Sequence, residues 1–418
     1  MKLFDRLLIV ITILIPYQIY LPSFYKDKNV TLYMIVVAVG VFLYFFKERG
    51  VVNRMREIAA DRDQRPVLWY LGFFMCIVGA FFYSGNKVDA VKHILFLGMG
   101  ILIYVMFAYR GGALTPVSIA RVFLFSSVPL AIMVLVVFVF KEHQYAILGS
   151  PIMKIFIEPD TLRNMLADRY FCNVLDAGRA GGLFVNAQEG AQFAGFNLLI
   201  VGWLWSKQRS NIFPLIGVLW LCALIAFGTM TGVIACALTM LCGLVLLTVK
   251  RKWSVIPSLI VVMFIIAGVV LMPWLQPRLA KYRTFDSSVN GRSRIWHASA
   301  LVIGDHWVKG VGLDSNSWER AYAPHAEKVG AILKVPPHNV FLFVWAKAGI
   351  LAFLCFVGFF ISAICRYSLD FLRSGDTYAL LVAMAFIWFG AECMTENFLI
   401  MDLRLAGALW MIMGLRVK

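Results

Sequence analysis

Charged residues are scarce in this sequence. Of its 418 residues only 15% are Asp, Glu, Lys or Arg, whereas 61% are hydrophobic and the mean hydropathy is +0.80. Soluble globular domains carry about 25% charged residues, so the composition excludes an ordinary soluble domain. The sequence therefore predicts an integral membrane protein.

The sequence also lacks the strand-length alternation of apolar and polar residues that marks a transmembrane β-barrel. Its apolar residues occur in long runs, and in lipid only a helix pairs all the backbone groups of such a run. A helix needs about 20 apolar residues to cross a bilayer. We predict an all-α polytopic membrane protein with about 12 transmembrane helices, near residues 7–22, 30–46, 67–84, 93–108, 117–140, 191–205, 212–227, 232–249, 254–275, 349–365, 378–394 and 399–415.

Acidic residues are fewer than basic ones, 23 against 39, and the formal charge of +16 raises nucleic acid as a partner. The positions of the charges decide against it, because Lys and Arg in short loops stay on the cytoplasmic side. With Met1 on that side, 19 basic residues lie in cytoplasmic tails and short loops, and 5 lie in the short loops opposite. We therefore predict cytoplasmic termini and no nucleic-acid partner.

Two long segments, 141–190 and 276–338, fall on the outer side of a single membrane domain that covers residues 1–418. Five of the six histidines lie there, so we expect the chemistry there, and the site mainly in the second segment. The histidine spacing matches no helical metal pair. Of the eight cysteines, Cys172 alone falls in these segments, which excludes a disulfide within a loop. We expect neither a metal nor a cofactor.

The first polar cluster is residues 178–189, Gly-Arg-Ala-Gly-Gly-Leu-Phe-Val-Asn-Ala-Gln-Glu, directly before an apolar run. Glycines on both sides of Arg179 let the backbone approach a bulky anionic ligand, and the guanidinium group offers paired donors to phosphate. Asn186 and Gln188 are further candidates for ligand binding. The alternative interpretation is a flexible hairpin whose arginine reaches the lipid interface.

The second cluster is residues 290–296, Asn-Gly-Arg-Ser-Arg-Ile-Trp. Arg292 and Arg294 are two residues apart and point to different sides of a helix, so we expect only one of them to face a given ligand. Gly310 and Gly312 follow. Because a third glycine and a preceding strand are missing, this pair favours a tight turn over a phosphate-binding loop.

The third cluster begins with Pro336 and Pro337, which end any preceding helix and allow a new one to start at His338 and Asn339. Histidine changes charge nearest to neutral pH, so a neutral His338 is a candidate proton acceptor. Helix capping is the alternative for both polar residues, and the stronger one for Asn339. Lys347, in the apolar run that follows, is either a side chain that extends to the membrane surface or a site residue, and we favour the first interpretation.

A last group of ionisable residues lies at the turn that joins the last two predicted spans. Ionisable residues at membrane depth are functional hypotheses by default, which makes Glu396 a candidate. A structural ion pair between Glu396 and Arg404 is the alternative interpretation.

These motifs together resemble the O-antigen ligase and O-antigen polymerase superfamily of bacterial envelope glycosyltransferases. The resemblance covers about residues 178–404, and it rests on the segment from Arg179 to Gln188, on Gly291-Arg292-x3-Trp296 with Gly310-x-Gly312, and above all on His338-Asn339-x9-Gly349. Two departures stand out. Ala352 replaces a second glycine of the last motif, and residues 228–232 lack an arginine that members often carry there, so Arg179 is left to serve the diphosphate without that partner.

The resemblance implies metal-independent, inverting transfer of a glycan from undecaprenyl diphosphate, at the periplasmic face of the bacterial inner membrane. The long segments 141–190 and 276–338 are then periplasmic. The resemblance implies a general base in His338 and a catalytic arginine in Arg292. The residues it implies for substrate binding are Arg179, Arg294, Asn186, Gln188, Asn339 and Glu396.

Within the superfamily, the length, the predicted spans and one dominant late loop favour the ligase, whose acceptor is the lipid A-core oligosaccharide. An O-antigen polymerase is the alternative. A protein O-oligosaccharyltransferase usually carries a longer C-terminal region and is less favoured. A transporter, the alternative from another class, would place ionisable residues at mid-bilayer in paired broken helices, whereas the polar clusters here gather outside.

Overall fold

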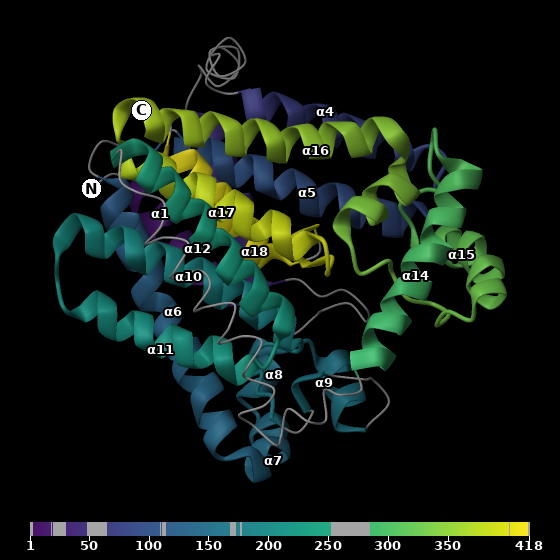
Figure 1. Ribbon diagram of the computed structural model, residues 1–418, viewed down its shortest axis with the longest axis horizontal. Coiled ribbons are helices and arrows are strands. Elements are labelled where there is room, and N and C mark those ends of the chain that lie inside the picture. Colours follow the sequence, from purple (N-terminus) through teal and green to yellow (C-terminus); the bar gives the residue numbers. More distant parts are fainter. Residues whose placement is uncertain are drawn as a thin grey trace.

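The computed structural model describes residues 3–17, 19, 31–47, 65–108, 110, 114–167, 173–175, 178–251, 285–400 and 402–416. Within these ranges every regular element is a helix (Figure 1). The predicted all-helical class is confirmed.

Several described helices are apolar enough to lie in a membrane. The helices that also reach membrane-crossing length are α5 (Lys87–Ala108), α6 (Pro116–Val139), α12 (Met230–Arg251) and α16 (Val340–Ser374). The shorter apolar helices are α4 (Arg65–Phe81), α11 (Ile212–Phe227), α17 (Thr377–Cys393) and α18 (Leu403–Leu415).

Two further helices coincide with predicted spans, α2 (Leu32–Lys47) and α10 (Ala187–Gln208). The predicted run 254–275 lies outside the described residues. The total of twelve crossings therefore stays a prediction.

The first helix differs from its predicted bounds. The run 7–22 predicted a span, but α1 covers Leu3–Leu14 and has 12 residues. Pro16 explains the early end, because proline disfavours helical geometry at the residue before it and lacks an N–H group for the helix.

The apolar helices pack against one another as a bundle. Helix α16 lies along α4 and α17, α10 lies along α11, and α18 lies along α5. In Figure 1 the two marked ends of the chain lie on the left, whereas α14 (Phe285–His306) and α15 (Ser315–Val329) lie on the right. The marked ends of the chain therefore lie at one end of the bundle, and α14 and α15 lie at the other.

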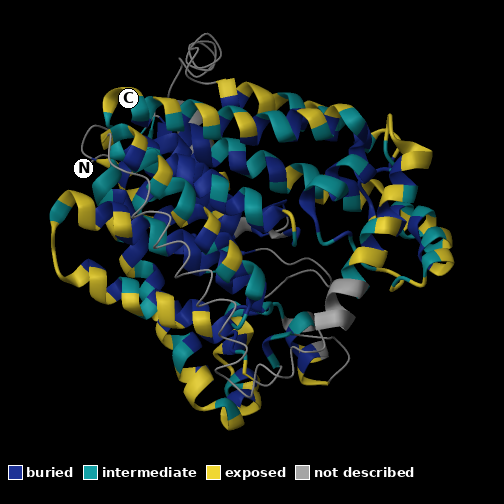
Figure 2. Cartoon of the chain, viewed as in Figure 1, coloured by how far each residue is buried: buried dark blue, intermediate teal, exposed yellow. Residues whose placement is uncertain are grey.

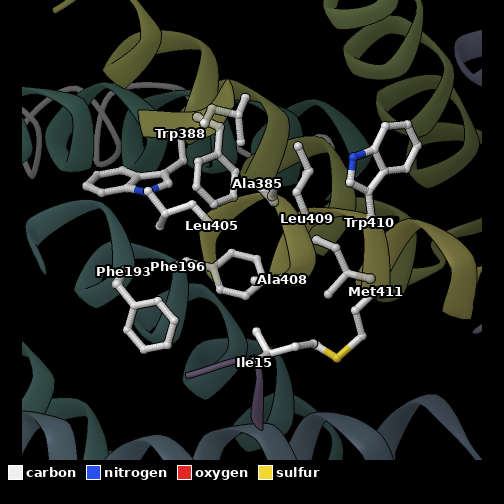
Figure 3. Close-up of a cluster of buried hydrophobic side chains, with 14 of the residues drawn as sticks. Ile15, Phe193, Phe196, Ala385, Trp388, Leu405, Ala408, Leu409, Trp410 and Met411 are labelled. Atoms are coloured by element: carbon white, nitrogen blue, oxygen red, sulfur yellow. The ribbon is translucent and has the colours of Figure 1, made fainter. Parts of the chain in front are cut away.

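The centre of the bundle is filled by aromatic and aliphatic side chains from α10, α17 and α18 (Figure 3). Trp388 is buried there, and its indole Nε1 donates to the carbonyl of Gln192 at 2.9 Å. The outer faces also carry large apolar residues that are exposed, such as Met75, Leu215 and Leu351, and Figure 2 shows exposed residues along the outside of α16 and α11. Exposed apolar side chains on long helices suit contact with lipid.

Helices α14 and α15 form a second, smaller core. It buries Ile295, Ala298 and Val302 of α14 against Trp318 and Tyr322 of α15. The Trp318 and Tyr322 rings stack with their centroids 4.9 Å apart. The part of the predicted segment 276–338 that the structure describes is thus a helical cap on one end of the bundle.

The other long segment is built from short helices. They are η2 (Lys141–His143), α7 (Gln144–Gly149), α8 (Met153–Phe156), α9 (Pro159–Leu166) and η3 (Asn173–Leu175). Lys141 Nζ donates to the carbonyls of Val174 at 2.8 Å and Arg179 at 2.5 Å. One lysine at the start of the segment therefore fixes its far end, directly before α10.

Helix α16 is broken at Gly349, which has φ 81° and ψ −180°. At the break the chain pairs with residues 307–312. The Ile350 N–H donates to the carbonyl of Trp307 at 2.9 Å, and the Val311 and Gly312 N–H groups donate to the carbonyls of Ala346 and Lys347 at 2.8 and 3.0 Å.

Glycine is required on both sides of this contact. A Cβ atom at Gly349 would lie 2.0 Å from the carbonyl oxygen of Val308, and one at Gly310 would lie 2.5 Å from that of Lys347. Both glycines also have positive φ, which side chains disfavour. The glycines of two sequence motifs thus meet at one place, and the break sets off residues 340–348 as a short helix that begins next to His338.

Candidate active site

His338 lies at the start of α16 and is held in an uncommon backbone conformation, with φ 50°. Asn339 is the N-cap of the helix, and its Oδ1 accepts from the Leu342 N–H at 3.1 Å. Asn339 Nδ2 also donates to the carbonyl of Met394 at 3.0 Å. The predicted helix start is confirmed, and the described contacts of Asn339 are structural ones that tie this start to the turn after α17.

The imidazole of His338 contacts a buried carboxylate. Nδ1 lies 3.1 Å from Glu396 Oε2, and the side chains of His338 and Glu396 are 33% and 5% exposed. With the ring proton on Nδ1 and donated to Glu396, Nε2 is left as the nitrogen that can accept a proton. The partly exposed ring can therefore reach a ligand through Nε2, while Glu396 fixes its orientation through Nδ1.

Arg292 of α14 contacts the other oxygen of the same carboxylate. Its Nη2 donates to Glu396 Oε1 at 2.7 Å and to Gln188 Oε1 at 3.1 Å. Gln188 Nε2 donates in turn to Thr231 Oγ1. The Arg292 side chain is 30% exposed, and a guanidinium group has five N–H donors, so it can also donate to an anionic ligand.

Four residues from separate polar clusters of the sequence thus form one network, which we call the His338 cluster: Gln188, Arg292, His338 and Glu396. The cluster joins α10, α14, the start of α16 and the turn after α17, four segments far apart in the chain.

The residues of the first polar cluster take different places. Asn186 is the N-cap of α10, where its Oδ1 accepts from the Gln188 N–H at 2.9 Å and from Asn173 Nδ2 at 3.0 Å. It therefore positions the turn that carries Gln188. Arg179 is half-buried, and its carbonyl is held by Lys141. Its role toward a ligand stays a prediction.

Arg294 is directed elsewhere than Arg292. It is exposed, and its Nη1 donates to the carbonyl of Gly330 at 3.3 Å, at the end of α15. The two side chains thus point in different directions from α14, as expected if only one of them faces a given ligand.

Glu396 and Arg404 do not pair with each other in the described contacts. Arg404 instead forms ion pairs with Glu189 and Asp402, and its guanidinium group lies 4.6 Å from the centroid of the Phe184 ring. All three charged side chains are buried. This second network fixes the first turn of α10, where Gln188 lies, against the start of α18.

Replacement of Arg404 by Ala should lower the free energy of unfolding strongly. Removal of one partner from a buried ion pair costs about 3 to 5 kcal/mol, because the other charges are left uncompensated. Thermal or denaturant unfolding of the purified protein in micelles measures the change. Arg121 is the matched control, since it is exposed and donates to Gln208 Oε1 at 2.9 Å; we expect Arg121→Ala to change stability by less than about 0.5 kcal/mol. Equal effects of the two substitutions would contradict a special role for the buried network.

Two polar residues near the cluster were not singled out from the sequence, Thr231 and Gln192, whereas Glu392 belongs to the last group of ionisable residues. Gln192 Nε2 donates to Glu392 Oε2 at 3.3 Å, and both side chains are buried. The sequence does contain a pattern that could have identified Gln192. Polar side chains at 188, 189 and 192 recur at helical spacing where an apolar span begins, and lipid does not tolerate such groups without partners.

The interpretation of Lys347 as a side chain that extends to the membrane surface was wrong. Lys347 is buried, and its Nζ donates to the carbonyl of Leu313 at 2.5 Å and lies 4.8 Å from the centroid of the Phe343 ring. The long stem alone suggested a path to water, but a carbonyl from a distant segment supplies the partner inside the protein.

The described part of the chain contains no group of three or more His, Cys, Asp or Glu side chains placed to hold a metal ion. Positive charge in the His338 cluster is supplied by Arg292. An oriented imidazole beside a guanidinium group can accept a proton at one point and stabilise an anion at another.

The apolar helices and the polar site at one end of the bundle are features of a membrane protein with an enzyme-like centre. Residues 215–357 match the O-antigen ligase family. The match includes Arg292, His338 and the break at Gly349, and it supports the resemblance to the O-antigen ligase/polymerase superfamily. A search of curated proteins found no match to the chain.

Proposed function

We propose that this protein transfers O-antigen polysaccharide from undecaprenyl diphosphate to the lipid A-core oligosaccharide, at the periplasmic face of the inner membrane. The match to the O-antigen ligase family supports a ligase or polymerase activity on lipid-linked glycans. The observation that carries the proposed mechanism of transfer is the contact of one buried carboxylate, Glu396, with both His338 and Arg292.

His338 acts on the acceptor in this proposal. Nε2 takes the proton of the attacking sugar hydroxyl while the hydroxyl oxygen forms a bond to the anomeric carbon of the donor. Glu396 holds the ring through Nδ1 and stabilises the imidazolium ion that forms, as a buried carboxylate does in other His-dependent centres. Such base catalysis contributes typically 10² to 10⁴ in rate.

Arg292 acts on the donor. The bond between the anomeric carbon and the diphosphate oxygen breaks, and negative charge grows on the leaving undecaprenyl diphosphate. A guanidinium group already held by Glu396 and Gln188 stabilises that charge without reorganisation. A single displacement inverts the anomeric configuration, so no covalent enzyme intermediate and no metal are required. The cap of α14 and α15 suits a cover over the sugars.

The fold is compatible with the predicted orientation. Figure 1 places the marked ends of the chain opposite α14 and α15; α14 carries Arg292 and packs against α16. With the termini in the cytoplasm, as the distribution of Lys and Arg predicts, the His338 cluster faces the periplasm.

The choice of acceptor is tested with purified protein in lipid vesicles that contain the lipid-linked glycan. One reaction receives core lipopolysaccharide, and the other receives a second lipid-linked unit. Glycan attached to the core supports the ligase. Chains that grow by one repeating unit at a time, with no transfer to the core, would instead identify a polymerase.

Arg179→Ala should impair use of the diphosphate-linked donor in the same assay, with an expected rise in donor KM of about tenfold, which corresponds to roughly 1.4 kcal/mol. Arg163, on the short helix α9 of the same long segment, supplies the control, and Arg163→Ala should change donor KM less than twofold. Donor KM equal to that of the wild type in Arg179→Ala would remove this residue from the donor site.

A further inference from the structure

The break in α16 is anchored by a buried cation. Lys347 lies two residues before Gly349 and is 4% exposed. Its Nζ donates to the carbonyl of Leu313, and the Leu313 N–H donates to Ser84 Oγ at 2.8 Å. Lys347 therefore joins the short helix 340–348 to the segment 307–313 and, through that segment, to the turn between α4 and α5.

Two carboxylates lie close enough to Lys347 to interact with it electrostatically, Asp89 and Asp314. Asp89 Oδ2 accepts from the Ser315 N–H at 2.8 Å, and Asp314 Oδ2 accepts from the Gly85 N–H at 2.8 Å. Burial acts to raise the pKa of Asp314, but hydrogen bonds from Ser317, Gly85 and Asn86 outweigh it and hold the pKa below its ordinary value. An ionised Asp314 thus faces the buried ammonium group.

The helix between Lys347 and His338 is short and is held at both ends. Lys347 lies nine positions after His338, about 14 Å at the rise of an α-helix. At the far end Asn339 Nδ2 donates to the carbonyl of Met394, two residues before Glu396. A shift of the helix at Lys347 is therefore transmitted to the point where the His338 ring meets Glu396.

We propose that Lys347 is a positioning residue for the transfer reaction: by holding the end of helix 340–348 against the segment 307–313, it keeps the imidazole of His338 in contact with Glu396. Lys347 touches no part of the His338 cluster itself in the described contacts. The inference rests on the proposed function, in which His338 is the base.

Lys347→Met is the primary test. Methionine has a similar length and retains apolar contact with the small cavity lined by Phe73, Ile77 and Leu97, but it loses the charge and the donor. We expect kcat to fall about tenfold or more, with KM for donor and acceptor changed less than twofold, because the misplaced base affects the chemical step and leaves ground-state binding intact. Lys328→Met, an exposed lysine of α15, is the control and should keep the wild-type kcat.

A double-mutant cycle separates positioning from general damage. If Lys347 acts through the contact between His338 and Glu396, Lys347→Met should have less than about a threefold effect in a Glu396→Gln background, because the contact is already altered there. Single-turnover rates give the residual activity of the slow variants. A full tenfold effect of Lys347→Met in that background, or a wild-type kcat in Lys347→Met alone, would overturn the proposal.

A milder variant covers the case in which Lys347→Met fails to fold. Ser84→Ala removes the hydroxyl that accepts from the Leu313 N–H and leaves Lys347 in place. It should lower kcat about threefold, and this effect should also disappear in the Glu396→Gln background; a threefold effect that persists there counts against the proposal. Failure of the proposed function itself is recognised separately, by full activity of His338→Ala.

Discussion

His338→Ala should lower the rate of glycan transfer by 10² to 10⁴ while the protein remains folded and inserted in the membrane. The substitution removes the nitrogen that accepts the proton of the attacking hydroxyl. The contact with Glu396 is lost at the same time, but that carboxylate keeps Arg292 as a partner at 2.7 Å, so no buried charge is left alone. The measurement is the initial rate of transfer per amount of folded protein.

The chain offers a matched control for this prediction. His325 Nε2 lies 2.9 Å from Asp305 Oδ2, so α14 and α15 carry a second imidazole and carboxylate pair. In the described contacts that pair has no arginine partner. His325→Ala should retain transfer within about twofold of the wild type. Full activity of His338→Ala, or equal losses in the two variants, would remove His338 from the role of base.

The helical fold could be predicted because each membrane helix corresponds to a continuous run of apolar residues in the sequence. The predicted run 117–140 corresponds closely to α6, and Thr115 as the N-cap before Pro116 marks the start of that helix. The break at Gly349 could not be predicted in this way. Residues 340–348 and 350–374 are both apolar and helical, and the break depends on hydrogen bonds from residues 307–312.

The members of the site could be predicted more readily than their pairing. Arg292, His338 and Glu396 were selected as members of separate polar clusters, and the structure brings them together. The alternative interpretation of Glu396 paired it with Arg404, eight residues away, because the sequence shows only neighbours along the chain. In the fold Glu396 pairs with residues 58 and 104 positions away.

Buried lysines and arginines were the hardest to interpret. Lys347 and Arg404 both lie in or beside apolar runs, where a long side chain can either extend to water or find a partner inside the protein. The sequence near each residue does not distinguish these outcomes. The partners are Leu313 for Lys347 and Glu189 for Arg404, and both belong to distant segments.

Arg292→Ala should lower kcat by about 10² to 10³, the usual effect of removing one preorganised donor to a developing anion. Arg292→Lys should not restore the rate. The Arg292 Nη2 makes the contacts with both Glu396 and Gln188, so Nε and Nη1 of the planar group are left to donate to a phosphate, which a single ammonium nitrogen cannot reproduce. The rates are measured with saturating donor and acceptor.

The loss of Arg292 also leaves Glu396 with His338 as its remaining described partner, so stability has to be measured beside activity. Arg294→Ala is the matched comparison, since it removes the same charge from the same helix two residues away, at a side chain that contacts the carbonyl of Gly330. We expect its kcat to lie within about threefold of the wild type. The two arginines differ in the direction in which they leave α14 and not in their chemistry, so a difference between the two alanine variants reports the position of the charge. Transfer at the wild-type rate in Arg292→Ala would show that another group stabilises the diphosphate. Restoration of the rate by Arg292→Lys would show that charge alone is sufficient.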